Sequence, residues 1–511
     1  MTSEVAGTVT SGAGDVAGDF QPETSANETS ALEKRPLIVD LDGTLIRSDI
    51  LVESAFALLG KNPFAIFSLV TTLFGKGKAG LKNYVADRSD IDIAHLPYEE
   101  EVLAVIRQAR DEGRAVYLAS ASHEKYVGAI ADHLGLFDGW FATNDKTNLS
   151  GSAKRQLLVD KFGAGGFDYI GNEAVDLKVW ADAHDAIAVN PPSSVKSKLK
   201  KRSPQATIIE TLPSRLKTWI KMLRVHQWAK NGLVMVPLLT SQNFDVQSVL
   251  LGIGAFFAFS LTASSIYIIN DAVDIDADRQ HPSKKFRPLA AGTMPILSAV
   301  MAIPVMLTIA LVGAWFINPI FLAVLVGYLC LTTAYTFSLK RKLLVDVVAL
   351  AGLYTVRVLG GAAALSLAVS EWLLAFSLFV FTCLALIKRY TELVVRFDND
   401  MPDPTNRNYR KSDLPIIATL AAAAGFNAVT VFALYVSDDE VASLYANPLL
   451  LWLICPLLLY WLGRALMLAH RRAMHDDPIV FALKDRNSRL TMLAVAAVMV
   501  AAMVKLPFTF G

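Results

Sequence analysis

Cysteine is scarce in this sequence, which contains 3 cysteines among 511 residues. Cys330, Cys383 and Cys455 all lie inside apolar segments, and none has the spacing of a metal-ligand pair. The sequence therefore excludes a disulfide framework and a cysteine-bound metal, and it suits a reducing compartment with thiols buried in a membrane. Residues 1–34 lack an apolar core, so we expect a disordered tail there and no signal peptide.

Charge is sparse as well. Charged residues make up 19% of the chain and hydrophobic residues 53%, and the net charge is only +1. This composition is too apolar for an ordinary soluble enzyme, and the length exceeds that of one domain. The net charge identifies no partner, and we predict no nucleic-acid binding. The number of subunits stays open, a homo-oligomer included.

Lysine and arginine are missing from four long segments of the second half, which are residues 231–278, 288–339, 358–387 and 412–463. A membrane-spanning helix needs about 20 apolar residues, so most of these segments fit a helix that crosses and one that returns. The basic clusters between them mark the cytoplasmic side. We predict an all-α polytopic membrane domain over 216–511 in a bacterial inner membrane, with the N-terminal half in the cytoplasm. The nine expected spans lie near 228–241, 248–269, 295–316, 320–338, 343–366, 371–387, 414–436, 447–466 and 490–509.

An acidic run stands where one apolar segment meets basic residues. It contains Asn270, Asp271, Asp274, Asp276 and Asp278 within nine positions. Carboxylates this close repel one another unless they face water or bind a cation. Their oxygen atoms suit Mg²⁺, which proteins usually hold with one or two carboxylates and substrate phosphates. Because positions three and four apart share a helix face, the run predicts a Mg²⁺–diphosphate site at the membrane surface. A solvated acidic helix end is the alternative.

Several segments of the second half together resemble the UbiA family of membrane prenyltransferases, across about 220–510. Within that family they look like the decaprenyl-phosphate phosphoribosyltransferase branch. The resemblance implies transfer of 5-phosphoribose from phosphoribosyl diphosphate to a polyprenyl phosphate, with release of diphosphate. It rests on LRVHQWAKN (223–231), NDAVDIDADRQHPSKKFRPLAAG (270–292), YTFSLKRKLLVD (335–346), LIKRYTEL (386–393), NYRKSDLP (408–415) and DDPIVFALKDR (476–486).

One departure from the broader family favours this branch. Aromatic prenyltransferases carry a second aspartate-rich motif after the sixth span, where this chain has Lys388, Arg389 and Glu392. Cations in place of carboxylates suit an acceptor that is itself a phosphate. The same two cations also fit the ordinary cytoplasmic boundary of a span, so position alone does not separate the two interpretations.

The resemblance implies roles for residues of the membrane half. Asp271, Asp274 and Asp278 would bind Mg²⁺ and activate the leaving diphosphate, with Asn270 beside them. Arg357, an arginine inside an apolar span, is expected to pair with Asp346 or to face a cavity shared with a phosphate. Candidates for the donor phosphates are Arg224, His226, Lys230, Lys284, Lys285 and Arg287; candidates for the acceptor phosphate are Lys340, Arg357, Lys388 and Arg389.

The first half predicts a soluble α/β domain over 35–190, followed by a Pro/Ser/Lys linker over 191–215. Short apolar strands at 36–39, 116–119 and 167–170 each end at polar residues. Asp40 and Asp42 follow the first strand, Ser120 ends the second, and Asp176 comes after the third. With Lys154 between them, these residues resemble the haloacid dehalogenase-like phosphatase superfamily.

That resemblance implies a Rossmann-like domain with a helical cap near 51–85. Asp40 would be the nucleophile and Asp42 the general acid/base, while Ser120 and Lys154 would hold the phosphoryl group. Mg²⁺ would be bound by Asp40, Asp42 and Asp176, with Asn172 where an acid is usual. The missing charge leaves open a domain that kept the fold but lost activity. If active, the domain is expected to remove the 5-phosphate of the phosphoribosyl lipid.

Two other functions stay open at this stage. One is prenyl transfer from a polyprenyl diphosphate to an aromatic acceptor, within the same family. The other is a transporter or membrane anchor whose soluble domain does the chemistry. The acidic run at a membrane edge counts against the latter, because transporters usually place their charges near the midplane.

Overall fold

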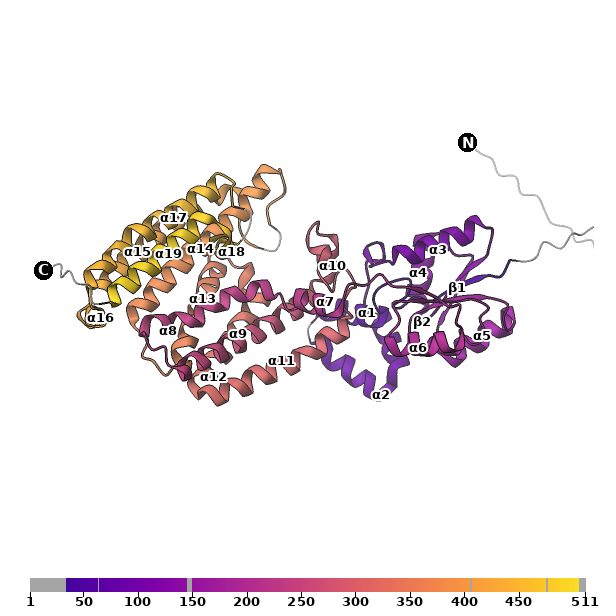
Figure 1. The fold of residues 1–511 in the computed structure, drawn as a ribbon. Coiled ribbons are helices and arrows are strands. Elements are labelled where there is room, and N and C mark those ends of the chain that lie inside the picture. Colours follow the sequence, from indigo (N-terminus) through magenta and orange to yellow (C-terminus); the bar gives the residue numbers. More distant parts are fainter. Residues whose placement is uncertain (1–33, 63, 145–148, 405–406, 475–476, 505–511) are drawn as a thin grey trace, which may run out of the picture.

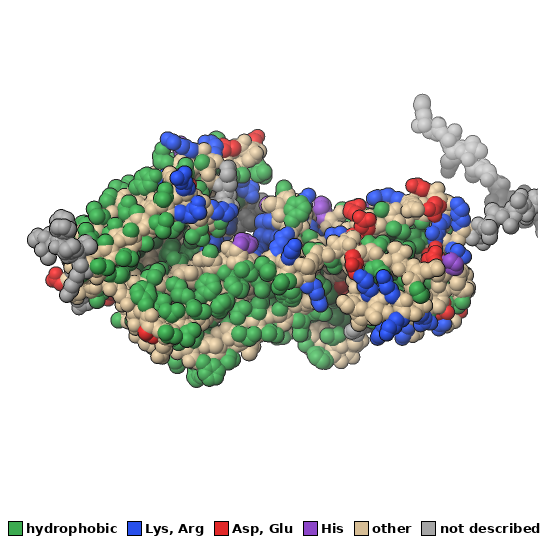
Figure 2. All heavy atoms as spheres, viewed as in Figure 1, with side chains coloured by type: hydrophobic (Ala, Val, Ile, Leu, Met, Phe, Trp, Pro, Cys, Tyr) green, Lys and Arg blue, Asp and Glu red, His purple; other side chains and the backbone are tan. Residues whose placement is uncertain are grey.

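The computed structural model describes residues 34–62, 64–144, 149–404, 407–474 and 477–504. The predicted tail lies outside these residues except for Lys34. The chain forms an α/β half and a long helical half (Figure 1). They meet end to end through α1 (Ile50–Lys61), α7 (Arg215–Met222) and α10 (Ile275–Gln280). Figure 2 shows apolar side chains covering much of the helical half, whereas charged side chains are spread over the α/β half.

The α/β half is built on one six-stranded parallel sheet with the strand order β3-β2-β1-β4-β5-β6. Its strands are short and apolar, as expected for a sheet covered on both faces. The order places β1 in the middle, so residues that follow β1 lie at the centre of the sheet's carboxyl edge. The strands are β1 Leu37–Val39, β2 Val116–His123, β3 Gly139–Thr143, β4 Asp168–Gly171, β5 Ala186–Val189 and β6 Thr207–Ile209.

Two apolar clusters fill the two faces of the sheet. Because neighbouring side chains of a strand point to opposite faces, Leu37 belongs to one cluster and Ile38 to the other. Helices α3 Glu100–Asp111 and α4 Glu124–Leu134 pack into the first cluster. Helices α5 Ser152–Phe162 and α6 Ser193–Arg202 pack into the second. The structure thus has the α/β architecture that the sequence predicted.

The predicted linker over 191–215 is wrong. Helix α6 and strand β6 lie inside that range, and β6 pairs with β5. The Pro/Ser/Lys composition suggested a loop, but Val195 and Leu199 stand one helical turn apart and are both buried. These two side chains fix an otherwise polar helix on the sheet, so the α/β half extends beyond the predicted boundary.

The predicted cap consists of two helices inserted after β1. Helix α1 covers Ile50–Lys61, and α2 covers Ala65–Ala86 with a break at Gly77, whose φ is 65°. A small cluster joins them, in which Leu58 of α1 packs with Leu69 and Val85 of α2.

The helical half contains seven helices that are long and apolar enough to cross a membrane, counted over the part of the chain that the structure describes. Their length and composition are those of a multi-pass membrane domain. The helices are α9 Val246–Val273, α11 Ile296–Ile317, α12 Pro319–Phe337, α13 Val345–Ala364, α14 Glu371–Asp398, α15 Leu414–Ser437 and α17 Ile454–His470.

The predicted count of nine spans is not confirmed. The first expected span is a 3₁₀ helix, Val225–Met235, followed by the short α8, Val236–Ser241. The ninth corresponds to α19, Arg486–Met503, whose first turn is polar and carries Arg486 and Arg489. Both segments pack against the bundle, but neither matches the length and composition of the other seven.

The two halves share a buried interface. Val52 and Phe56 of α1 pack against Met222, Ile268 and Ile275 of the helical half. Near them, the guanidinium of Arg279 donates to both carboxylate oxygens of Glu53 at 3.0 and 2.5 Å, and both side chains are buried. Removing one partner of such a pair costs about 3–5 kcal/mol. The contact therefore fixes the cap next to the acidic run, which Arg279 directly follows.

Two candidate active sites

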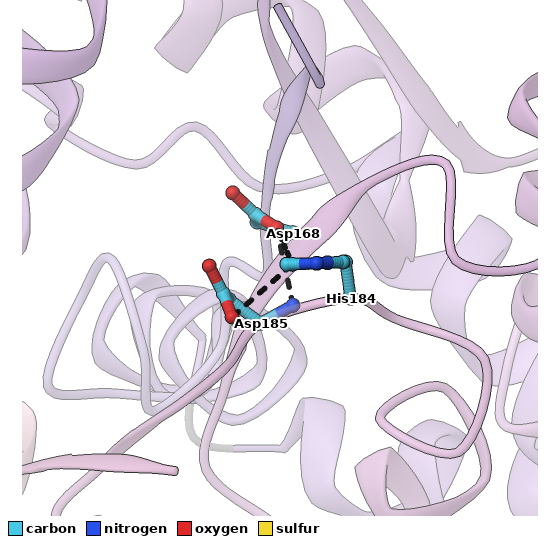
Figure 3. Close-up of side chains that lie close together, drawn as sticks. All are labelled: Asp168, His184 and Asp185. Carbon is cyan, nitrogen blue, oxygen red and sulfur yellow. Dashed lines mark hydrogen bonds and ion pairs between the residues drawn. The ribbon is translucent and has the colours of Figure 1, made fainter. Parts of the chain in front are cut away.

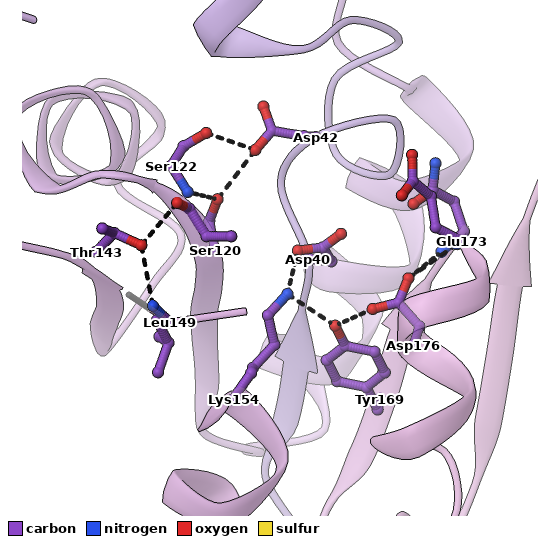
Figure 4. Close-up of polar contacts among 12 residues, drawn as sticks. Asp40, Asp42, Ser120, Ser122, Thr143, Leu149, Lys154, Tyr169, Glu173 and Asp176 are labelled. Atoms are coloured by element: carbon purple, nitrogen blue, oxygen red, sulfur yellow. Dashed lines mark hydrogen bonds and ion pairs between the residues drawn. The ribbon is translucent and has the colours of Figure 1, made fainter. Parts of the chain in front are cut away.

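The first site forms at the carboxyl edge of the sheet, where β1 ends at Asp40 and Asp42 (Figure 4). Asp42 accepts hydrogen bonds from the hydroxyls of Ser120 and Ser122 at 3.1 and 2.6 Å, and from the backbone N–H of Ile50 at 2.8 Å. Ser120 was predicted for this site, but Ser122 was missed. The signal for it was its position two residues along the same strand, which places both hydroxyls on one face.

Lys154 completes the centre of this site. Its ammonium group donates to Asp40 at 2.6 Å and to the hydroxyl of Tyr169 at 3.1 Å, and that hydroxyl donates to Asp176 at 2.8 Å. All four side chains are buried. Sequence reasoning found the lysine and both acids but missed Tyr169, which in the sequence is one aromatic residue of an ordinary buried strand.

Asn172 lies at the same edge of the sheet. Its backbone N–H donates to Asp176 at 3.0 Å. Its side-chain amide packs so closely on Gly43 that a Cβ there would approach the amide nitrogen to 2.1 Å. The side-chain oxygen of Asn172 is buried without a hydrogen-bond partner in the structure. An unpartnered buried oxygen at the sheet edge that carries Asp40 and Asp176 fits a ligand for a hard cation, so the residues present are compatible with Mg²⁺.

Burial controls the charge of this site. It raises the pKa of Asp40 to about 7, against the attraction of Lys154 and with the repulsion of Asp176 in support. Burial, and to a smaller extent repulsion from Asp49, also raises the pKa of Asp42 to about 6. Protonation of these crowded carboxylates therefore stabilises the folded site. A bound cation would likewise reduce the repulsion between them.

A second carboxylate cluster in this half lies at the opposite edge of the sheet. Asp168 begins β4, and His184 and Asp185 precede β5 (Figure 3). Asp168 forms an ion pair with Arg114 and accepts the backbone N–H of Asp185 at 3.1 Å. These bonds satisfy its carboxylate and tie the starts of the strands together, so the cluster is explained by the fold.

The second site forms where α9 ends. The helix stops at Val273, Asp274 adopts a non-helical conformation, and the chain continues as α10, Ile275–Gln280. The break brings Asp271 and Asp278 to one guanidinium: Arg287 donates to them at 3.0 and 2.6 Å. Arg224 forms a second ion pair with Asp271.

The rest of the acidic run is less constrained. Asn270 and Asp274 are half-buried beside this pair, and Lys284 lies 3.9 Å from Asp278. Burial raises the pKa of Asp278, although Arg287 opposes the shift. The carboxylates of the run offer ligands for a divalent cation. The two arginines that contact them offer N–H donors for a phosphate.

A cavity of about 490 Å³ opens next to this run. One wall is formed by His281 and Lys284, and the facing wall by Lys388, Arg389 and Glu392 of α14. The structure therefore brings residues predicted for the donor and for the acceptor to one cationic space. Further basic residues of its lining are Arg396 and Arg407.

Two aspartates hold the cations of this cavity, Asp477, which sequence reasoning gave no role, and Asp346, which it considered only as a partner of Arg357. Asp477 accepts from Lys388 at 2.8 Å and from Lys230 at 2.9 Å, and these two cations hold its pKa well below its usual range even though burial opposes the shift. Asp346 pairs with Arg389 at 2.9 Å and accepts from Tyr409 at 2.5 Å. The lysine and arginine are thus positioned by the bundle and do more than mark its boundary.

Arg357 is placed differently from the prediction. It does not pair with Asp346; it donates to Asn231 at 2.8 Å and to the hydroxyl of Tyr328 at 2.9 Å, and it also bonds the carbonyl of Leu353. All of these groups lie within the bundle, so each nitrogen of this guanidinium already donates there.

Three other predicted residues lie at the surface. His226 and Lys285 are exposed, and Lys340 is half-buried in the short turn after α12. None of the three lines the cationic cavity. Although the side chain of His226 is largely exposed, partial burial of its ring lowers its pKa. The positive charges of Arg224 and Lys230 lower it further, which favours the neutral form.

Comparison with known proteins assigns residues 233–486 to the UbiA prenyltransferase family. An uncharacterized protein, y4nM, of Sinorhizobium fredii is 37% identical over 474 residues, which cover 92% of this chain and 91% of that protein. Nodulation protein NoeC of Azorhizobium caulinodans is 34% identical over 280 residues, or 55% of this chain and 91% of that protein. Decaprenyl-phosphate phosphoribosyltransferase of Corynebacterium glutamicum is 30% identical over 280 residues, or 52% of this chain and 79% of that protein.

Solved structures resemble each half at low identity. A UbiA homolog from Archaeoglobus fulgidus bound to GPP and Mg²⁺ is 15% identical with a TM-score of 0.43, and covers 55% of this chain and 99% of that one. A phospho-aspartyl intermediate analogue of phosphoserine phosphatase is 18% identical with a TM-score of 0.26, and covers 37% and 98%. The chain belongs to the UbiA prenyltransferase family, with an α/β domain ahead of its membrane domain.

Proposed function

We propose that the membrane half transfers 5-phosphoribose from 5-phosphoribosyl 1-diphosphate to a polyprenyl phosphate. We propose further that the N-terminal half removes the 5-phosphate of the product, and that this half faces the cytoplasm of a bacterial cell. The observation that carries the proposal is the cationic cavity beside the acidic run. A prenyltransferase with two metal–diphosphate motifs would have carboxylates where this cavity has Lys388 and Arg389.

The donor would occupy the space between the acidic run and its arginines. Arg224 and Arg287 contact Asp271 and are positioned to bond phosphate oxygens as well. A Mg²⁺ ion held by Asp271, Asp274 and Asp278 would neutralise charge on the leaving diphosphate. The bond between the anomeric carbon and the diphosphate oxygen breaks, and the electron pair leaves with diphosphate.

The acceptor phosphate would lie against Lys388 and Arg389. One of its oxygens attacks the anomeric carbon and forms the new bond. No general base is required, because a phosphate monoester is already anionic at neutral pH. Asp477 and Asp346 keep the two cations in place while leaving part of their donor capacity for the substrate. The Corynebacterium glutamicum relative, named for phosphoribosyl transfer to decaprenyl phosphate, supports this choice of substrates.

The N-terminal site has the groups needed for a phosphatase. Asp40 would attack the phosphorus atom, and the phosphate–sugar bond would break with a proton delivered to the sugar oxygen by Asp42, whose pKa of about 6 suits this role. Lys154 would hold the transferred phosphoryl group beside Asp40. Water would then give a proton to Asp42 and attack the phosphorus atom, so that the bond to the Asp40 oxygen breaks and inorganic phosphate is released.

The transferase is tested with membranes that contain the full chain, radiolabelled phosphoribosyl diphosphate and decaprenyl phosphate. We expect label in an organic-extractable lipid, and we expect Asp271→Ala to abolish it. Asp276→Ala is the matched control, since Asp276 belongs to the same run but points toward Arg279, 3.9 Å away. Equal incorporation by the Asp271 variant would place the site elsewhere, and label that requires an aromatic acceptor would favour prenyl transfer.

The phosphatase is tested by supplying the phosphoribosyl lipid to the full chain with Mg²⁺. We expect inorganic phosphate from the wild type and none from Asp40→Asn, while incorporation of labelled phosphoribose continues in that variant. Absence of phosphate release by the wild type would leave the N-terminal half as a structural domain.

A further inference from the structure

Helix α2 of the cap exposes an apolar face that its own domain does not cover. The side chains of Phe64, Phe67 and Phe74 are 77%, 70% and 85% exposed. Exposed apolar residues of this size are unusual in a soluble domain when they form one patch. The exposed set is completed by Ile66, Val70 and Leu73.

The spacing of these residues makes the face continuous. Positions 67, 70 and 74 follow one another at three and four residues, so they stand above one another along the helix. Ala65 and Leu69 point the other way and are buried. The face runs along the apolar stretch Ala65–Gly77 and ends at the break at Gly77. It is therefore a strip along an amphipathic helix and not a scatter of single exposed residues.

The position of α2 relates this strip to the exposed apolar surface of the membrane half. Helix α1 ends against the membrane half, where a Cβ at Gly60 would lie 3.4 Å from the backbone oxygen of Val273 at the end of α9. Helix α2 begins directly after α1 and packs on it, and α1 in turn contacts α11. On α11, Leu297 and Met301 are 58% and 61% exposed and would face lipid. The strip thus continues the lipid-facing surface of the membrane domain.

Charge at the ends of the strip fits the same surface. Lys61 precedes Phe64 and Lys76 follows Phe74, and both lysine side chains are exposed. Lysines that flank an apolar helix face can reach phosphate headgroups while the apolar side chains enter the acyl boundary.

We propose that the Ala65–Gly77 stretch of α2 lies in the bilayer surface next to the N-terminal half, with Phe64, Phe67 and Phe74 inserted among lipid chains. The cap is then fixed to the membrane at two places, through the packing of α1 on the bundle and through α2 on lipid. Resting on the proposed phosphatase function, this arrangement selects phosphomonoesters whose remainder stays in the membrane.

The test replaces single residues of the full chain by photoreactive benzoylphenylalanine, in nanodiscs that contain radiolabelled phosphatidylglycerol. The aromatic replacement keeps the character of Phe67 and Phe74. Leu297 of α11 is the positive control, and the exposed Glu101 of α3, on the other side of the domain in Figure 1, is the negative control. Illumination is followed by measuring lipid label attached to the chain.

We expect positions 67 and 74 to capture lipid as well as position 297 does, and several times better than position 101. Lipid capture at 67 and 74 no higher than at 101 would overturn the proposal. A crosslinked dimer in place of a lipid adduct would also overturn it, because a second copy would then cover the strip. The readout needs neither enzymatic activity, so it fails independently of the proposed function.

Discussion

The two acidic sites of this chain solve the same electrostatic problem in different ways. In the N-terminal site, Lys154 is the cation bonded to Asp40, while Asp42 is held by hydroxyls and a backbone N–H. In the membrane site, Asp271 alone contacts two arginines. In the first site one lysine serves several carboxylates, whereas in the second site the carboxylates are shared among several cations.

This difference matches the size of the groups that the sites are proposed to bind. A single phosphoryl group needs one nucleophile and one well-placed cation. A diphosphate carries more charge over a longer span, and arginines that exchange carboxylate oxygens for phosphate oxygens can follow it. The comparison predicts that the N-terminal site is sensitive to loss of its one lysine, whereas the membrane site tolerates loss of one arginine.

The largest effect is expected for Lys154→Met. The change removes the cation from a buried carboxylate and the donor from the phosphoryl group, so the rate of phosphate release should fall by about 10²–10³-fold. Transfer of phosphoribose to lipid should not change, which the radiolabel assay measures in the same preparation. A fall in both activities would show that the two sites do not work separately.

A smaller effect is expected for Arg287→Met. Arg224 still contacts Asp271 in this variant, so the site keeps one of its two arginines. We expect KM for the sugar diphosphate to rise by about 10–100-fold with kcat less affected, because one charge-assisted contact is worth about 1.5–3 kcal/mol. Complete loss of transfer would contradict the idea of shared cations, and Arg287→Lys should retain more activity than the methionine variant.

Asn172→Asp tests the cation site of the N-terminal half. An added carboxylate next to Asp40 and Asp176 should tighten Mg²⁺ binding by about tenfold, since affinity rises with the number of charged ligands. In EDTA the same change should lower the thermal midpoint, because it adds buried negative charge. Calorimetry with and without Mg²⁺ measures both effects, and a variant stabilised in EDTA would show that no cation binds there.

The smallest effect concerns pH. Because burial raises the pKa of Asp42 to about 6, the folded chain binds a proton that the unfolded chain has released above about pH 4. Its stability in EDTA should therefore fall as the pH rises from about 4 to about 6. Asp42→Asn should flatten that slope in thermal scans, while a steeper slope would contradict the assigned cause.

The sequence was informative wherever residue type and strand position act together. Asp40, Ser120 and Asp176 could be placed at one sheet edge because parallel strands end on the same side. The acidic run was also recognisable in the sequence, because clustered carboxylates at a membrane edge have few functions other than binding a cation. Composition gave a wrong prediction for 191–215, where a linker was expected. There the burial of only two side chains, Val195 and Leu199, fixes a helix on the sheet.

Pairing across the chain could not be predicted. Asp346 and Arg357 are eleven positions apart and seemed suited to each other, yet Arg389 takes the aspartate, while Asn231 and Tyr328 take the arginine. Asp477 appeared in the sequence only as part of the segment 476–486, with no role of its own. In the structure it forms ion pairs with both Lys230 and Lys388, which are distant from it in the chain.

The sequence by itself determined that this protein joins an α/β half to a membrane half, each with its own carboxylates, because apolar runs and motif spacing are local properties. Only the tertiary structure decided which cation meets which carboxylate, where α9 breaks, and that α2 presents an apolar strip beside the bundle. These features depend on side chains that are distant in the chain but share one buried space, where a charge without a partner is too costly to keep.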